Sequence, residues 1–99
     1  MNTQICQAIA SKNVIEFRYK GKWIRLFEPH TYGIHKDTNN EVLSGYQLGG
    51  FSESGNLPDW RLFRVSEITS LTITQDKFLS PRPGYNSRDS RMSRIFCTI

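Results

Sequence analysis

The chain has 99 residues, a formal net charge of +4, 37% apolar residues and 12% aromatic residues. This length fits one domain with one modest core, and the aromatic share is typical of packed strands rather than of disorder. No run of about 18 apolar residues could cross a membrane, and the N-terminus lacks a signal-peptide pattern, so we expect a cytoplasmic protein without a membrane partner.

The positive charge is concentrated near the C-terminus. Residues 79–99 hold four arginines against one aspartate, whereas residues 1–78 hold nine basic against eight acidic residues. Such a basic segment can attract phosphate polymers or acidic surfaces, or can simply keep the protein soluble, and both interpretations stay open.

The two cysteines, Cys6 and Cys97, lie near opposite ends of the chain. They form no CxxC pair and no spacing suited to zinc, so we expect neither a metal nor a cofactor. In a reducing cytosol two free thiols are expected, although the sequence also allows a bridge between the ends.

The first predicted element is a short helix that Asn2 or Thr3 caps and that reaches about Lys12, with Asn13 ending it. Apolar side chains recur there at the helical spacing (Ile5, Ala8 and Ile9), so one stripe faces a core. A helix this short is not stable alone and must pack on another element.

Strands are predicted next. Residues 14–19 alternate apolar and polar, residues 20–22 form a tight turn in which Gly21 can take positive φ, and residues 23–28 return as a strand that Pro29 ends or kinks. Further strands are expected at residues 31–34, 41–48, 60–65 and 69–74. The fold class is therefore mainly β, a small SH3-like or Sm-like barrel of about five antiparallel strands with one N-terminal helix.

The amino-acid composition changes at Leu79, after which Pro, Gly, Ser and Arg dominate. We interpret residues 1–78 as the domain and residues 79–99 as an extended, basic C-terminal tail. Apolar residues return at residues 92–99, which are expected to dock back on the barrel or on a second copy of the chain, giving a homodimer.

Three stretches, IEFRYKGKWIRLFEPHTYGI, EVLSGYQL and WRLFRVSEITSLTI, together resemble the WYL domain. The matching positions are residues 15–19, Arg25, residues 28–30, Leu43, residues 45–46 and residues 61–64. The chain departs from the family where Glu41-Val42-Leu43 replaces Trp-Tyr-Leu and where Glu67 replaces an arginine. No space remains for the winged-helix domain that usually precedes a WYL domain, so the resemblance is to a free-standing one.

The resemblance implies an Sm-like barrel and a regulatory or sensor role. Relatives act in transcription regulators and in regulators of defence systems, and are thought to bind nucleic acids or nucleotide-like effectors through a basic groove. The leading functional hypothesis is accordingly a module that binds an anionic ligand, nucleotide or nucleic acid. The alternative is a structural or oligomerisation module without a small ligand.

The candidate ligand-binding residues are arginines interleaved with aromatic residues, a pattern suited to phosphates and stacked bases. They are Arg18, Arg25, His30, Tyr46, Arg61 and Arg64. Arg61 is predicted to offer its planar guanidinium to an anion at the barrel mouth, or else to pair with Glu28 or Glu67 as a structural bridge. For His30 a structural hydrogen bond is the simpler role, and ordinary sheet composition equally accounts for the aromatics.

No enzyme motif is present. The serines lack a GxSxG context, Gly49-Gly50 is not followed by the GK[ST] of a phosphate loop, and neither histidine has an evident nucleophile partner. We therefore expect no catalytic residues.

Overall fold

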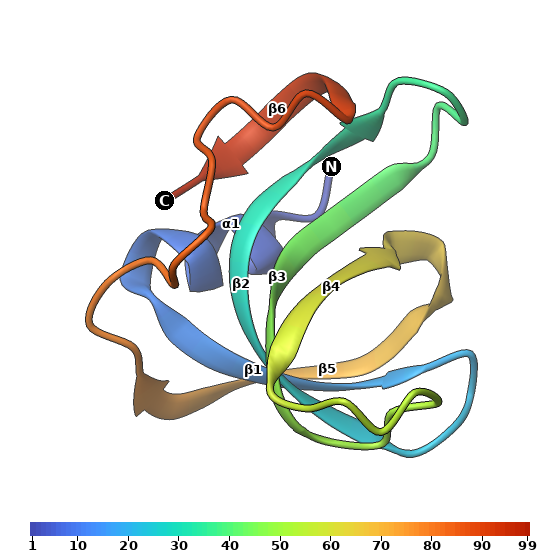
Figure 1. Cartoon of the computed structure of the whole chain (residues 1–99), viewed down its shortest axis with the longest axis vertical. Coiled ribbons are helices and arrows are strands. Elements are labelled where there is room, and N and C mark those ends of the chain that lie inside the picture. Colours follow the sequence, from blue (N-terminus) through green and yellow to red (C-terminus); the bar gives the residue numbers. More distant parts are fainter.

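The computed structural model describes all 99 residues, which form one helix and six strands (Figure 1). The elements are α1 (Thr3–Ser11), β1 (Asn13–Tyr19), β2 (Ile24–His35), β3 (Glu41–Gly50), β4 (Asp59–Arg64), β5 (Ile68–Lys77) and β6 (Met92–Thr98), with a 3-10 turn at Val65–Glu67. The predicted mainly β class with a single N-terminal helix is confirmed. The one helix is too short to span a bilayer.

All strand pairs are antiparallel, in the order β4-β3-β2-β1-β5, and β6 pairs with β2. One edge of β2 is shared, because residues 24–27 pair with β1 whereas residues 31–35 pair with β6. Figure 1 shows the resulting curl, in which β1 and β5 run steeply across the direction of β2 and β3. The small antiparallel β domain is as predicted, but the sheet is not closed into a barrel, because the end strands β4 and β5 do not pair, and a sixth strand adds to β2 beyond the about five expected.

β2 is a single long strand that continues past Pro29, so the prediction of two separate strands on either side of this proline is wrong. Pro29 pairs with Gly45, and the register shifts between Pro29 and Thr31. A proline has no N–H to donate, and an irregularity in the ladder is where that loss is tolerated. Gly45 permits the close approach, since a Cβ there would lie 2.2 Å from the Glu28 carbonyl oxygen.

Helix α1 forms as predicted. The Asn2 side chain accepts a hydrogen bond from the Ile5 amide at 3.1 Å, and the helix ends at Lys12, which has φ of 53°. Its buried stripe packs on one face of the sheet to build the core, which comprises Ile5, Ala8, Ile9, Ile15, Phe17, Phe27, Tyr32, Leu43 and Phe63. The three phenylalanine rings meet edge to face, with centroids 5.2–5.8 Å apart.

The cysteines are not free. Cys6 of α1 and Cys97 of β6 form a disulfide, so the expectation of two free thiols is wrong. The pairing follows from the topology: β6 adds to the edge of β2 that lies beside α1, and this brings the two Cα atoms to 5.7 Å across 91 residues of sequence.

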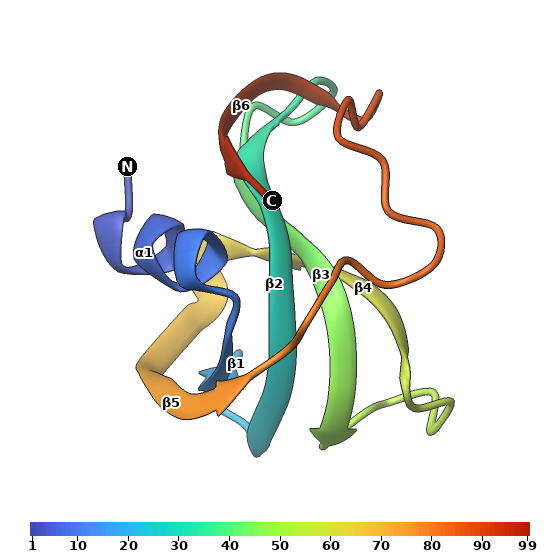
Figure 2. The same ribbon diagram turned by 90° about the vertical axis from the view of Figure 1, so that its left-hand side faces the viewer.

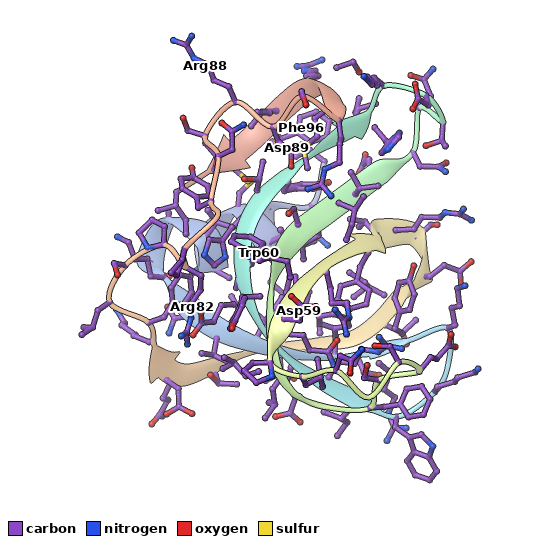
Figure 3. All side chains as sticks on the ribbon, viewed as in Figure 1. Asp59, Trp60, Arg82, Arg88, Asp89 and Phe96 are labelled. Carbon is purple, nitrogen blue, oxygen red and sulfur yellow. A yellow bond between two sulfur atoms is a disulfide. The ribbon has the colours of Figure 1, made fainter.

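Residues 78–91, here called the strap, connect β5 to β6 across the face of the sheet opposite α1 (Figure 2). The strap contains neither helix nor strand, yet it is held on the sheet. The Trp60 indole N–H donates to the Pro83 carbonyl at 2.8 Å, and Arg82 pairs with Glu28. Figure 3 shows Trp60 and Arg82 where the strap crosses the sheet, and Arg88 projecting away from it. The final segment docks on its own chain as β6, so residues 92–98 belong to the same sheet as β1 to β5.

Candidate anion-binding site

A cavity of about 240 Å³ opens between the β1–β2 turn and the loop that follows β3. We call it the Arg25 pocket. It brings together two of the six predicted ligand residues, Arg25 and Arg61, with residues from three other segments. The complete lining is Tyr19, Lys20, Lys22, Arg25, Ser52, Glu53, Ser54 and Arg61.

Arg25 is the central residue of this pocket and is only 7% exposed. Its guanidinium carbon lies 5.1–5.4 Å from the ring centroids of Tyr19, Phe51 and Phe63. None of its donors has a hydrogen-bond partner in the chain, and its Nε is fully buried without one. The rings therefore hold this cation by cation–π attraction, and its Nη groups, unlike the buried Nε, are left for an acceptor from outside.

Burial lowers the pKa of Arg25 from its usual value, while the nearby carboxylate of Glu53 acts in the opposite direction. Arginine titrates so far above neutrality that it stays charged when buried. A buried cation without an ion-pair partner is costly, and an anion that enters the pocket would relieve that cost.

The backbone at Gly50 explains how Phe51 comes to cover Arg25. Gly50 pairs with Arg25 across β2 and β3 and has φ of +85°. A Cβ there would lie 2.2 Å from the Ile24 carbonyl oxygen. Only glycine fits this left-handed, close approach, after which the Phe51 amide donates to the Ile24 carbonyl at 3.0 Å and places its ring over the guanidinium.

Arg61 lines the same pocket but is engaged by its own chain. Nη1 donates to the Asp59 carboxylate at 3.1 Å and to the Trp60 carbonyl, while Nη2 donates to the hydroxyls of Ser52 and Ser54 and to the Asn56 carbonyl. Asp59 is its acidic partner, so the predicted pairing with Glu28 or Glu67 is wrong. Arg61 positions the loop at residues 52–56 that forms one wall of the pocket.

Two lysines of the β1–β2 turn form the rim of the Arg25 pocket, and sequence reasoning missed them. Lys20 lies 5.6 Å above the Tyr19 ring, and Lys22 pairs with Glu53 at 3.5 Å with both side chains largely exposed. The signal was present in the sequence, since the lysines flank the turn glycine just before Arg25. With four cations and one carboxylate, the lining is electropositive.

Arg18 and Arg64 do not join this site. Arg18 is exposed on β1, where Nη1 reaches the Lys22 carbonyl at 3.5 Å. Arg64 is exposed at the end of β4, where it lines a separate hollow with His35 and Val42.

His30 and Tyr46 lie beneath the strap rather than in the Arg25 pocket. His30 is fully buried; its Nδ1–H donates to the Glu28 carbonyl at 2.8 Å, and its Nε2 accepts from the Arg82 amide at 3.1 Å. Burial lowers the pKa of His30 below its usual value. The Tyr46 ring packs under the Arg82 guanidinium at 4.7 Å. Both side chains therefore hold the strap.

The structure brings together no group of three or more His, Cys, Asp or Glu residues that could hold a metal ion. Comparison of the chain with protein-family models, with curated proteins and with solved structures finds no match.

Proposed function

We propose that this chain is a regulatory binding module that recognises a phosphate-bearing anion, either a nucleotide or a nucleic acid, in the Arg25 pocket. The observation that carries the proposal is the guanidinium of Arg25, which is buried on three aromatic rings and has no partner within the chain. Hydrogen bonds between a guanidinium and a phosphate are among the strongest in proteins, and the planar fork suits two phosphate oxygens at once.

The surroundings support the same class of ligand. Lys20 and Lys22 add charge at the rim, and the hydroxyls of Ser52 and Ser54 face the same space. The pocket combines cations and hydroxyls, and no histidine lines it to act as a general base beside a nucleophile. This composition supports binding rather than catalysis.

The resemblance to WYL domains belongs to this proposal, and so does a role in transcription or defence regulation. Arg25 is one of the positions that carry the resemblance. The Cys6–Cys97 disulfide argues against the expected cytoplasmic location, because disulfides persist mainly in oxidising compartments.

Binding of fluorescein-labelled single-stranded DNA and RNA, measured by anisotropy at low salt, tests the proposal, together with thermal-shift measurements on ATP and ADP. The informative variant is Arg25→Met, which keeps an unbranched apolar stem on the rings and removes the charge. Charge-assisted hydrogen bonds contribute about 1.5–3 kcal/mol each, so affinity should fall roughly tenfold or more.

Arg88→Met is the matched control, because Arg88 is exposed on the far side of the molecule (Figure 3). It changes the net charge by the same amount and should weaken binding far less. Equal losses for the two variants, or no measurable binding of any of these probes by the unmodified protein, would overturn the proposal.

A further inference from the structure

The strap is attached to the sheet at a titratable residue. His30 Nε2 accepts the amide hydrogen of Arg82, and the opposite nitrogen donates to the Glu28 carbonyl. The imidazole is fully buried, stacked on Phe78 with ring centroids 5.3 Å apart and edge-on to Trp60 at 4.8 Å. Only the neutral ring can make both hydrogen bonds, since a protonated imidazole carries a hydrogen on each nitrogen.

Burial is the largest influence on the pKa of His30 and lowers it; of the two charged groups beside the ring, Glu28 raises this pKa and Arg82 lowers it. From β2 comes Glu28, whose carboxylate is already occupied by Arg82. From the strap comes the Arg82 guanidinium itself, which opposes a second positive charge, and Tyr85, whose hydroxyl is bonded to Thr98 and Ile99. A proton on Nε2 would face the Arg82 N–H, so two donors would be in contact in a fully buried site.

The strap forms one side of an open cleft. A cavity of about 320 Å³ lies between it and the outer face of β2, β3 and β4. Thr31 and Ser44 form the floor, Trp60 and Leu62 a wall, and Tyr85 and Arg91 belong to the strap side. Arg91 closes the far end, since its Nη2 donates to the Ser44 hydroxyl at 3.2 Å. Movement of the strap away from the sheet would open this cleft further to solvent.

We propose that the strap is an acid-released cover: protonation of His30 breaks its hydrogen bond to the Arg82 amide, and the part of the strap that follows Phe78, residues 79–91, moves off the sheet and opens the cleft beneath more widely. This device is independent of ligand binding in the Arg25 pocket. Because burial lowers the pKa of His30 from its usual value of 6.5, release occurs on the acid side of that value and the strap is closed at neutral pH.

Trp60 reports the position of the strap, because its indole N–H donates to Pro83. A Trp23→Phe background leaves Trp60 as the single tryptophan. We expect its fluorescence to shift to longer wavelength between about pH 7.5 and about pH 4.5 as the indole becomes hydrated. In the same range the protection factor of the Arg82 amide should fall roughly tenfold or more, while amides of β1 to β3 stay protected, which distinguishes release from global unfolding.

His30→Gln is the decisive variant, since a glutamine side chain offers an acceptor that does not titrate. It should abolish the acid-induced shift, whereas His35→Gln, which changes the other histidine, should retain it. In the unmodified protein, the titration of the His30 ring followed by NMR should share its midpoint with the Trp60 shift, a test that does not depend on the folding of the variant. An unchanged Trp60 signal across this range, different midpoints, or the same shift in His30→Gln would refute the proposal.

Discussion

Arg82 holds the carboxylate of Glu28 with two hydrogen bonds, one from Nε at 2.6 Å and one from Nη2 at 2.9 Å. The Glu28 side chain is only 3% exposed, whereas that of Arg82 is 40% exposed. The hydrogen bonds that Arg82 donates to Glu28 raise the pKa of Arg82. One ion pair, buried on the sheet side and open on the solvent side, thus joins the strap to the middle of the longest strand.

Replacing Arg82 with alanine should destabilise the fold. The change leaves a buried carboxylate without its partner, which costs about 1–3 kcal/mol in the free energy of unfolding. Urea unfolding followed by circular dichroism measures this loss. Arg88→Ala serves as the control, because an exposed arginine without structural contacts should change stability by less than about 0.5 kcal/mol. Indistinguishable midpoints for the two variants would show that the ion pair contributes nothing.

Arg61→Ala should loosen the loop at residues 52–56 rather than remove a direct ligand contact. Its guanidinium donates to both serine hydroxyls and to the Asn56 carbonyl, and these donors disappear together. We expect faster amide exchange confined to this loop and a loss of about 1–2 kcal/mol in stability. Hydrogen exchange measured by NMR or mass spectrometry detects the change. Exchange rates that stay unchanged in residues 52–56 would contradict the positioning role.

Lys20 and Lys22 should act on binding through charge alone. For oligonucleotides, Lys20→Ala and Lys22→Ala should each reduce the slope of log affinity against log salt by roughly one. Arg25→Met should instead lower affinity even at high salt, because the Arg25 contact is buried and poorly screened. Anisotropy titrations at several salt concentrations separate the two effects. Identical salt slopes in all three variants would contradict the distinction between the rim lysines and the buried Arg25.

Reduction of the Cys6–Cys97 disulfide should lower stability. The bond closes 91 residues of sequence, so in the chain-entropy model its loss costs about 4–5 kcal/mol. Urea unfolding with and without a phosphine reductant measures the difference. The double variant Cys6→Ala, Cys97→Ala should be insensitive to reductant. A urea midpoint of the unmodified protein that does not change with reductant would contradict the prediction.

Ionisation of Tyr32 should lower the stability of the fold at alkaline pH. Burial, together with the hydrogen bond that its hydroxyl donates to Glu41, raises the pKa of Tyr32 to about 12. Between about pH 10 and 12 the folded state therefore retains a proton that the unfolded chain releases, so stability falls as pH rises through this range. Tyrosinate absorbance should show one of the four tyrosines titrating late, and Tyr32→Phe should remove that step.

Local sequence patterns predicted the local elements. The cap at Asn2, the helical stripe of Ile5, Ala8 and Ile9, and the turn at Gly21 all form because they depend on neighbours a few residues away. Pro29 misled the prediction, because a proline normally ends a strand and its tolerance at a register shift depends on a partner strand that the sequence does not reveal.

The strap and the candidate site were harder to predict from the sequence. Composition predicts how much apolar surface a segment can bury, and residues 79–91 bury little, so a tail was expected. What orders them is a small set of specific polar contacts, such as Arg82 with Glu28, 54 residues apart. Among the arginines, residue type alone could not separate Arg25, which has no partner, from Arg61, which has several; that distinction depends on side-chain geometry.

The edge shared by β1 and β6 along β2 also constrains the order of folding. β6 pairs with residues 31–35 of β2, so this part of the ladder and the Cys6–Cys97 bond can form only after residue 98 has been synthesised and has cleared the ribosomal exit tunnel. Pairings of such large sequence separation are slow to form. During translation, residues 31–35 of β2 therefore stay unpaired along this edge until β6 has been made.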